Sequence, residues 1–185
     1  MLNRKTIGLI VFIAWAALTA VWADDDGQPI KIRARYEIDA GTHTGRVVVF
    51  CEISAGHHIY SLQQLSPPGP TKILVADSDE FKLTTEFSAD HLPAVIDHDP
   101  IFETRLEQFT GKVAFTAPFQ FSNEADFEKL AIKLKLSCQV CSDDGCVLIR
   151  NKKIEVPYGG LVDPAAEKAD QPDRAASDSP DRKDH

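Results

Sequence analysis

The chain of 185 residues is acidic, with 20 lysine and arginine residues against 28 aspartate and glutamate residues and a formal charge of −8. This length allows one domain or two small ones. The acidic balance provides no electrostatic basis for binding nucleic acid or an anionic membrane surface, so both function classes are set aside. Of the four cysteines, Cys138, Cys141 and Cys146 fall within nine residues, and Cys51 stands apart.

The first 23 residues have the pattern of a secretory signal peptide. Arg4 and Lys5 precede an apolar run at 6–21, and a small-residue cleavage site ends at Ala23. The run is shorter than the roughly 20 residues that a membrane-spanning helix needs. We therefore predict that residues 1–23 are cleaved on export and that the mature chain is soluble and periplasmic. In that oxidising compartment, paired cysteines are expected to form disulfides.

Residues 29–158 are predicted to form one all-β domain. Residues 30–38 alternate apolar and charged side chains, the pattern of a strand with one buried face. Residues 46–53 are apolar at nearly every position, which predicts a strand covered on both faces. Further strands are predicted over 71–76, 81–87, 111–121 and 147–156. About seven short strands at this spacing predict an antiparallel β-sandwich.

Two segments of this domain need separate treatment. Residues 129–136 fit a helical face in part, but their alternation of apolar residues with lysines is stricter, so we predict a strand from Lys129. Residues 138–146 would then form the turn to the last strand. Pro118 lies inside a predicted strand and has no N–H to donate, which predicts an edge strand or a bulge there.

Residues 159–185 are predicted to be a disordered acidic tail. From Asp163 onward the chain has seven acidic and four basic residues, three prolines, and no isoleucine, leucine, valine, phenylalanine, tyrosine or tryptophan. Such a composition offers no apolar burial to offset the entropy of ordering. A linker or partner-binding tail and a solvated end without a role both fit this composition.

The clustered cysteines have three candidate roles, of which the first two fit poorly. A structural zinc or iron–sulfur cluster needs four ligands, and residues 147–151 add no histidine or cysteine to the three thiolates. We therefore predict no metal and no cofactor. The Cys-x-x-Cys motif at 138–141 lacks the following helix whose N-terminus lowers the thiol pKa in a thioredoxin-type pair.

The third role is a disulfide between Cys141 and Cys146 at a strand-to-strand turn, where Gly145 permits the necessary backbone geometry. Closing so short a loop stabilises a fold by only on the order of 2–3 kcal/mol, so a purely structural bridge has a modest effect. An exposed, closely spaced disulfide on a rigid scaffold is typical of a pair that exchanges electrons. Both interpretations stay open on these grounds.

Residues 137–146, read as Ser-Cys-Gln-Val-Cys-Ser-Asp-Asp-Gly-Cys, resemble the redox turn of the N-terminal domain in the thiol:disulfide interchange protein DsbD family. Residues 56–61, continuing into 67–73, and residues 98–102 resemble two further stretches of that domain, and together the matches span about residues 30–157. The resemblance implies an immunoglobulin-like antiparallel β-sandwich, in agreement with the strand pattern.

The same resemblance implies a thiol:disulfide oxidoreductase of the protein-disulfide reductase type. Electron transfer is expected from a membrane-embedded or thioredoxin-like donor, acting in trans, through Cys141 and Cys146 to exported thiol-disulfide proteins, including the route of cytochrome c biogenesis. No small-molecule substrate is expected. The alternative, from a different class, is a redox-inert β-sandwich that binds proteins and carries a structural disulfide.

Individual roles also follow from the resemblance. Cys146 would be the sulfur that forms the mixed disulfide, and Cys141 the resolving one. Phe102, with Asp99 and Glu103 beside it, would form a cap that excludes stray thiols until a partner docks.

The remaining two cysteines have two interpretations. The resemblance implies a second, structural disulfide between Cys51 and Cys138, whereas Cys51 also fits a buried apolar residue on its strand. Asp143 and Asp144, next to the reactive pair, are expected to disfavour its thiolate form and so to slow reaction with random disulfides.

Overall fold

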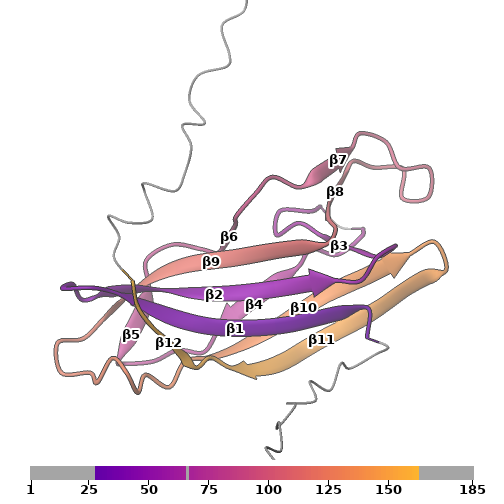
Figure 1. The fold of residues 1–185 in the computed structure, drawn as a ribbon. Coiled ribbons are helices and arrows are strands. Elements are labelled where there is room, and N and C mark those ends of the chain that lie inside the picture. Colours follow the sequence, from indigo (N-terminus) through magenta and orange to yellow (C-terminus); the bar gives the residue numbers. More distant parts are fainter. Residues whose placement is uncertain (1–27, 66, 163–185) are drawn as a thin grey trace, which may run out of the picture.

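The computed structural model describes residues 28–65 and 67–162, which form two β-sheets packed against each other (Figure 1). This described part of the chain contains no helix, and the predicted all-β sandwich is confirmed. The predicted signal peptide at 1–23 and residues 163–185 of the predicted tail lie outside the described residues.

The first sheet has the order β12-β1-β2-β9-β5, and β6 also pairs with β9. Its strands are β1 (Ile30–Asp39), β2 (Thr44–Ile53), β5 (Phe81–Leu83), β6 (Ser88–Ala89), β9 (Lys112–Phe121) and β12 (Tyr158–Val162). The three long strands β1, β2 and β9 run antiparallel to their neighbours in this group, whereas β12 lies parallel to β1.

The second sheet has the order β11-β10-β3-β8-β7, and β4 also pairs with β10. Its strands are β3 (His58–Tyr60), β4 (Lys72–Val75), β7 (Ala94–Ile96), β8 (Leu106–Phe109), β10 (Lys133–Ser142) and β11 (Gly145–Glu155). β10 is an interior strand, with β11 on one side and β3 and β4 on the other. The hairpin that carries the cysteines therefore has one covered strand and one edge strand.

Alternate side chains of the central strands fill the space between the sheets. On β9, Val113, Phe115, Ala117, Phe119 and Phe121 are buried, while the residues between them are partly or fully exposed. Each fully buried large apolar side chain contributes roughly 1.5–3 kcal/mol, so this core holds the two sheets in a fixed relation. The cysteine hairpin is thus built on a rigid base.

The strand predicted from Lys129 begins later and extends further. Lys129 N–H donates to Asp126 O at 2.9 Å and its side chain pairs with the Asp126 carboxylate at 2.7 Å, so this segment is a turn and β10 starts at Lys133. β10 then continues to Ser142, because Cys138 and Val140 bury their side chains in the core. The prediction that 138–146 is a turn is therefore wrong: the turn is only Asp143-Asp144.

The predicted end of the domain at Tyr158 is also wrong, because residues 159–162 belong to β12 and not to the tail. The Tyr158 ring packs 5.4 Å from that of Tyr36, and Val162 O accepts the Ala40 N–H at 2.9 Å. A Cβ at Gly159 would come within 2.7 Å of the Arg35 side chain, so glycine permits the close approach of β12 to β1.

Pro118 lies neither on a free edge nor at a bulge. It pairs with Arg46 on β2, and on its other side its carbonyl accepts the Thr84 N–H at 2.9 Å. The nitrogen and carbonyl of one strand residue face the same side. The missing N–H of Pro118 therefore faces the gap between β5 and β6, where no ladder partner needs it.

Candidate functional site

The β10–β11 hairpin brings two cysteines directly opposite each other. Ser142 pairs with Gly145 across the two-residue turn, and Cys141 pairs with Cys146 in the next position. Their sulfurs form a disulfide, with the Cα atoms 4.0 Å apart. Gly145 has a φ of 136°, a conformation that glycine adopts without a steric cost, which explains this residue at the turn.

The two halves of the disulfide differ in accessibility. Cys141 is only 3% exposed, because β10 is covered by β3 on its far side. Cys146 is exposed, because it lies on the edge strand β11. Cys146 is therefore more accessible to an attacking thiolate than Cys141.

A small buried cluster surrounds Cys141. Cys141 packs with Tyr60 from β3 and Leu106 from β8, apart from the main core that holds Val140 and Ile59. Because side chains alternate along a strand, this cluster lies on the outer face of the second sheet. The disulfide is thus outside the sandwich core and has an apolar environment of its own.

A hydrogen-bonded chain leads to the buried sulfur. The Tyr60 hydroxyl donates to Cys141 Sγ at 3.6 Å, and His58 Nε2 lies 3.2 Å from the Tyr60 oxygen. Burial, and secondarily the negative charge of Asp99, raises the pKa of Tyr60, so its hydroxyl stays protonated at neutral pH. Burial also lowers the pKa of His58, against the opposing charges of Asp143 and Asp99. The protonated Tyr60 hydroxyl is therefore an uncharged hydrogen-bond donor to Cys141 Sγ.

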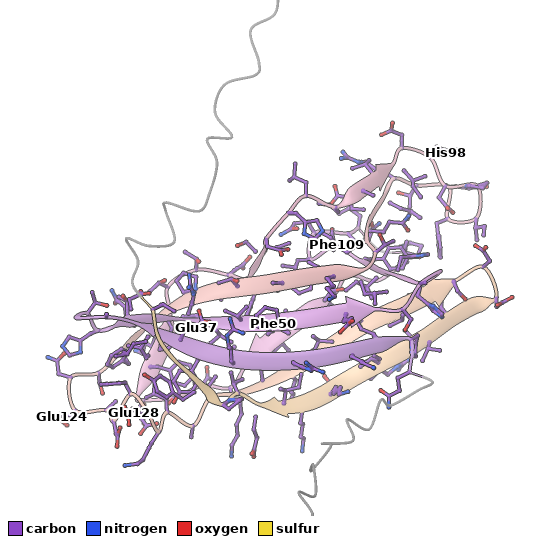
Figure 2. The ribbon with its side chains drawn as sticks, viewed as in Figure 1. Glu37, Phe50, His98, Phe109, Glu124 and Glu128 are labelled. Carbon is purple, nitrogen blue, oxygen red and sulfur yellow. A yellow bond between two sulfur atoms is a disulfide. The ribbon has the colours of Figure 1, made fainter. Side chains whose placement is uncertain are left out.

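The loop between β7 and β8 covers this cluster. Phe102 packs against it, with its ring centre 6.5 Å from that of Tyr60 in an edge-to-face contact. Figure 1 shows this loop at the same end of the molecule as the β10–β11 hairpin, and Figure 2 labels His98 in the same loop. The predicted cap residue Phe102 is thus beside the buried half of the disulfide.

Asp99 and Glu103 shape the loop more than they line the disulfide. Asp99 Oδ1 accepts the N–H groups of Ile101 and Phe102, each at 2.9 Å. Glu103 N–H donates to Asp99 O at 2.8 Å, and Glu103 has a φ of 53° with an exposed side chain. Asp99 therefore positions Phe102, and the contribution of Glu103 is made by its backbone.

Cys51 and Cys138 are free thiols, both buried in the main core on facing sheets. The predicted second disulfide is therefore absent from the structure, and the interpretation of Cys51 as a buried apolar residue agrees with it. Burial raises the pKa of Cys51 to about 12 and that of Cys138 to about 11. Protonated, buried thiols of this kind are poor nucleophiles.

Tyr60, His58 and Leu106 were missed as site residues in the sequence analysis. They come from β3 and β8, strands of three and four residues that are too short to show a periodicity. The available signal was the alternation in His58-Ile59-Tyr60, where the middle residue enters the core and its neighbours face the other side.

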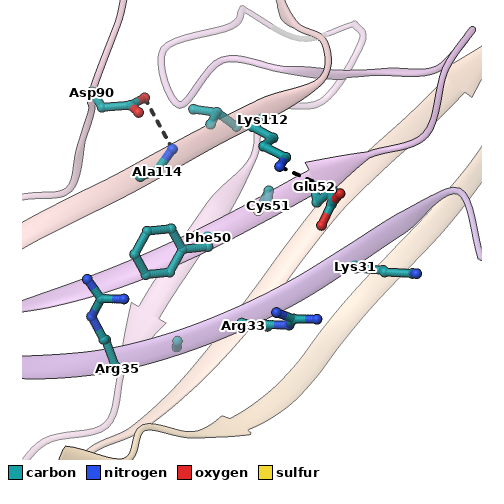
Figure 3. A pocket seen from close by; sticks show the side chains of 11 residues that line it. Lys31, Arg33, Arg35, Phe50, Cys51, Glu52, Asp90, Lys112 and Ala114 are labelled. Carbon is teal, nitrogen blue, oxygen red and sulfur yellow. Dashed lines mark hydrogen bonds and ion pairs between the residues drawn. The ribbon is translucent and has the colours of Figure 1, made fainter. Parts of the chain in front are cut away.

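The outer face of the first sheet carries a groove of about 500 Å³ that is separate from the disulfide (Figure 3). The Arg35 guanidinium lies 4.7 Å from the centre of the Phe50 ring, and Lys112 pairs with Glu52 at 3.9 Å.

Across residues 28–65 and 67–162, no three histidine, cysteine or acidic side chains gather as metal ligands. The same residues include no helix long and apolar enough to cross a membrane.

No protein-family model and no curated protein sequence matches this chain. Its structure is similar to the crystal structure of the N-terminal periplasmic domain of ScsB from Proteus mirabilis, with a TM-score of 0.51 and 14% identity. The match covers 78% of this chain and 53% of that one, so this chain spans about half the length of its neighbour.

A second similar structure is the yeast GGA1 GAE domain, at 15% identity over 68% of this chain and 91% of that one, with a TM-score of 0.38 that carries no argument. The identity to the ScsB domain is low enough that the likeness shows the fold alone. That fold is an all-β sandwich.

Proposed function

We propose that this protein is an exported thiol-disulfide interchange domain, a thiol:disulfide oxidoreductase of the protein-disulfide reductase type. The observation that carries the proposal is the unequal exposure of one disulfide, with Cys146 open to solvent and Cys141 buried under Phe102 and Tyr60. A disulfide that served only to tie the hairpin would need neither a cap nor a hydroxyl aimed at one sulfur.

Reducing equivalents enter by attack of a donor thiolate on Cys146 Sγ. The bond between the two sulfurs breaks, a mixed disulfide forms, and Cys141 leaves as a thiolate to which the Tyr60 hydroxyl donates. A second donor thiol then attacks the mixed disulfide and releases Cys146. The pair has gained two electrons and two protons, and the donor is left as a disulfide.

Delivery is the reverse sequence with an acceptor disulfide. The Cys146 thiolate attacks one acceptor sulfur and the other leaves as a thiolate, after which Cys141 attacks Cys146 and releases the reduced acceptor. The donor is a membrane-embedded or thioredoxin-like protein and the acceptors are extracytoplasmic thiol proteins, those of cytochrome c biogenesis among them. The periplasmic origin of the similar ScsB domain supports an exported, periplasmic location.

Thiol trapping tests this function. The purified protein is mixed with a reduced thioredoxin-like donor, quenched with an alkylating agent and weighed by mass spectrometry, with the expected gain of label at Cys141 and Cys146 only. A Cys141→Ser variant is expected to capture exported proteins through Cys146, whereas the matched Cys146→Ser variant captures none because Cys141 is buried. If the pair stays oxidised with every donor, the protein is not a thiol-disulfide interchange domain. The alternative function, a redox-inert β-sandwich that binds proteins, would then hold.

A further inference from the structure

Strand β11 is an edge of the second sheet, and Cys146 lies on it. Within residues 28–65 and 67–162, β11 pairs only with β10, so the side of β11 away from β10 carries backbone groups without a strand partner. Figure 1 shows β11 along the margin of the molecule. Exposed edges of this kind pair readily with other extended chains unless something blocks them.

The second half of β11 is blocked. Leu136 pairs with Lys152 and Cys138 with Ile149, so two residues of β11, Arg150 and Asn151, lie opposite a single residue of β10. Such a bulge interrupts the edge, and Asn151 has a φ of 49° there. Lys152 and Lys153 follow, and lysines on an edge strand are a common means of preventing strand addition.

The first half, residues 145–149, has none of these devices. It contains no charged residue and no proline, and its register with β10 is continuous. Val147 is 55% exposed and Leu148 54% exposed. The edge is therefore left open over the five residues that include the exposed cysteine.

The backbone geometry directs hydrogen-bonding groups to this open side. Opposed residues about 4.5 Å apart at Cα are a non-hydrogen-bonded pair, and Cys141 and Cys146 are 4.0 Å apart. The N–H and C=O groups of Cys146 thus point away from β10, and by alternation so do those of Leu148. Both are available to an added strand.

We propose that residues 145–149 of β11 bind an extended, cysteine-bearing segment of the partner protein as an added β-strand, which aligns the partner's sulfur with Cys146. This inference rests on the proposed function. Main-chain hydrogen bonds supply the affinity in strand addition, so one edge can serve partners of different sequence. The exchange itself is the attack of the Cys146 thiolate on the partner's disulfide, with the partner's second sulfur leaving as a thiolate.

The surface around the edge defines the chemistry of the segment. Val147 and Leu148 both follow Cys146, so they favour two apolar residues on one side of the partner's cysteine. The exposed Arg150, Lys152 and Lys153 favour acidic residues at the far end of the segment. In the antiparallel arrangement, the commoner one, these acidic residues precede the cysteine.

The test uses the full mature chain, reduced, and the disulfide-linked dimer of a ten-residue peptide with three glutamates, then valine, leucine and cysteine. Its rate of exchange is compared with that of hydroxyethyl disulfide, which has no backbone to pair. Leu148→Pro removes one outward N–H at the edge, where proline is tolerated, and is expected to lower the ratio of the two rates roughly tenfold. Leu148→Ala loses most of the same side chain but keeps the N–H, so the further fall in the ratio from Leu148→Ala to Leu148→Pro, expected to be at least about threefold, measures the N–H.

N-methylated peptides test the same point on the unchanged protein. Methyl groups on every second residue of the peptide block the N–H groups of one edge, and methyl groups on the intervening residues block the other. One set is expected to slow exchange roughly tenfold and the other to leave it nearly unchanged. Equal exchange rates for the two sets of methylated peptides, or an unchanged ratio of peptide to hydroxyethyl disulfide rates in Leu148→Pro, would contradict strand addition. The proposed thiol-disulfide exchange at Cys146 would still stand. If neither the peptide disulfide nor hydroxyethyl disulfide exchanges with the reduced protein, the proposed thiol-disulfide interchange function itself is contradicted.

Discussion

Tyr60 is the residue that links the buried sulfur to the rest of the site. Its hydroxyl donates to Cys141 Sγ at 3.6 Å, and it stays protonated because burial raises its pKa. A donor of this kind stabilises a thiolate more than it stabilises a disulfide sulfur, since hydrogen bonds to charged groups are the stronger ones. Tyr60 is thus placed to assist the departure of Cys141.

Tyr60→Phe is therefore expected to slow reduction of the disulfide by dithiothreitol roughly tenfold, because the leaving thiolate loses one hydrogen bond. The rate is measured by quenching with an alkylating agent and mass spectrometry. Tyr36→Phe is the control, since it removes a buried tyrosine hydroxyl from the other sheet. Equal rates in the two variants would show that the Tyr60 hydroxyl has no part in the exchange.

The two core thiols predict how stability depends on alkaline pH. Burial raises the pKa of Cys51 to about 12 and that of Cys138 to about 11, from an ordinary value of 9.0. In the unfolded chain both thiols ionise first, so the unfolded state loses protons before the folded state does. Their stabilising effect is complete below about pH 9 and is lost as the pH rises toward 11–12.

Urea unfolding at about pH 7.5 and about pH 10.5 measures this effect, which amounts to roughly 2 kcal/mol for each thiol at the higher pH. Cys51→Val removes one of the groups and is expected to reduce the loss of stability between the two pH values. The loss does not vanish, because the Cys138 thiol remains and burial also raises the pKa of Tyr36 and Tyr60. An identical loss in Cys51→Val and the parent would contradict the assignment.

The β7–β8 loop has a defined conformation, because the Asp99 carboxylate accepts hydrogen bonds from the segment that carries Phe102. Phe102→Ala is expected to speed reduction by dithiothreitol up to roughly tenfold, since the aromatic contact contributes about 0.5–1.5 kcal/mol and its loss lets water reach Cys141, which leaves as a thiolate. Asp99→Ala should act in the same direction, because the Ile101 and Phe102 N–H groups lose their acceptor.

Asp99→Asn separates this structural effect from a charge effect. Asparagine retains an oxygen acceptor at the same position, so the loop and the reduction rate should stay close to those of the parent. If Asp99→Asn were as fast as Asp99→Ala, the charge of Asp99 and not its hydrogen bonds would control the rate of reduction.

The predictability of each element followed its length. β1, β2 and β9 have ten residues each and show their alternation plainly, and the sandwich could be inferred from them. β3 has only three residues, and β12 contains Gly159 and Gly160, so neither carries a strand signal of its own. Such strands form because long neighbours provide an edge to pair with, which is a tertiary effect that a local pattern does not contain.

The candidate site divides in the same way. Cys141 and Cys146 are five residues apart, so their pairing across a hairpin followed from local spacing. Tyr60 is 81 residues from Cys141 in sequence, and only the pairing of β3 with β10 brings the two together. Phe102 was identified through the DsbD resemblance, and the residues alone did not indicate it.

At the scale of the whole molecule, the core between the two sheets is separate from the end of the second sheet that carries the disulfide. The disulfide, its cap and the open edge of β11 lie at one end of the second sheet, and the core between the sheets does not depend on them. β12 lies in the first sheet, on the edge beyond β1. Stability and exchange should therefore respond to different changes in the chain.

Two truncated chains test this separation. A chain that ends after Pro157 lacks β12, whereas a chain that ends after Val162 keeps it, so the difference between them reports on β12 alone. Without β12 the contacts of Tyr158 with Tyr36 and Phe127 are lost, together with the pairing to β1. The shorter chain is expected to be less stable by roughly 2–4 kcal/mol in urea unfolding.

The rate of disulfide reduction should be the same in both folded chains, because β12 has no contact with the Cys141 cluster. Equal stability would place the end of the domain before β12, and a changed reduction rate would show that β12 and the disulfide site are coupled.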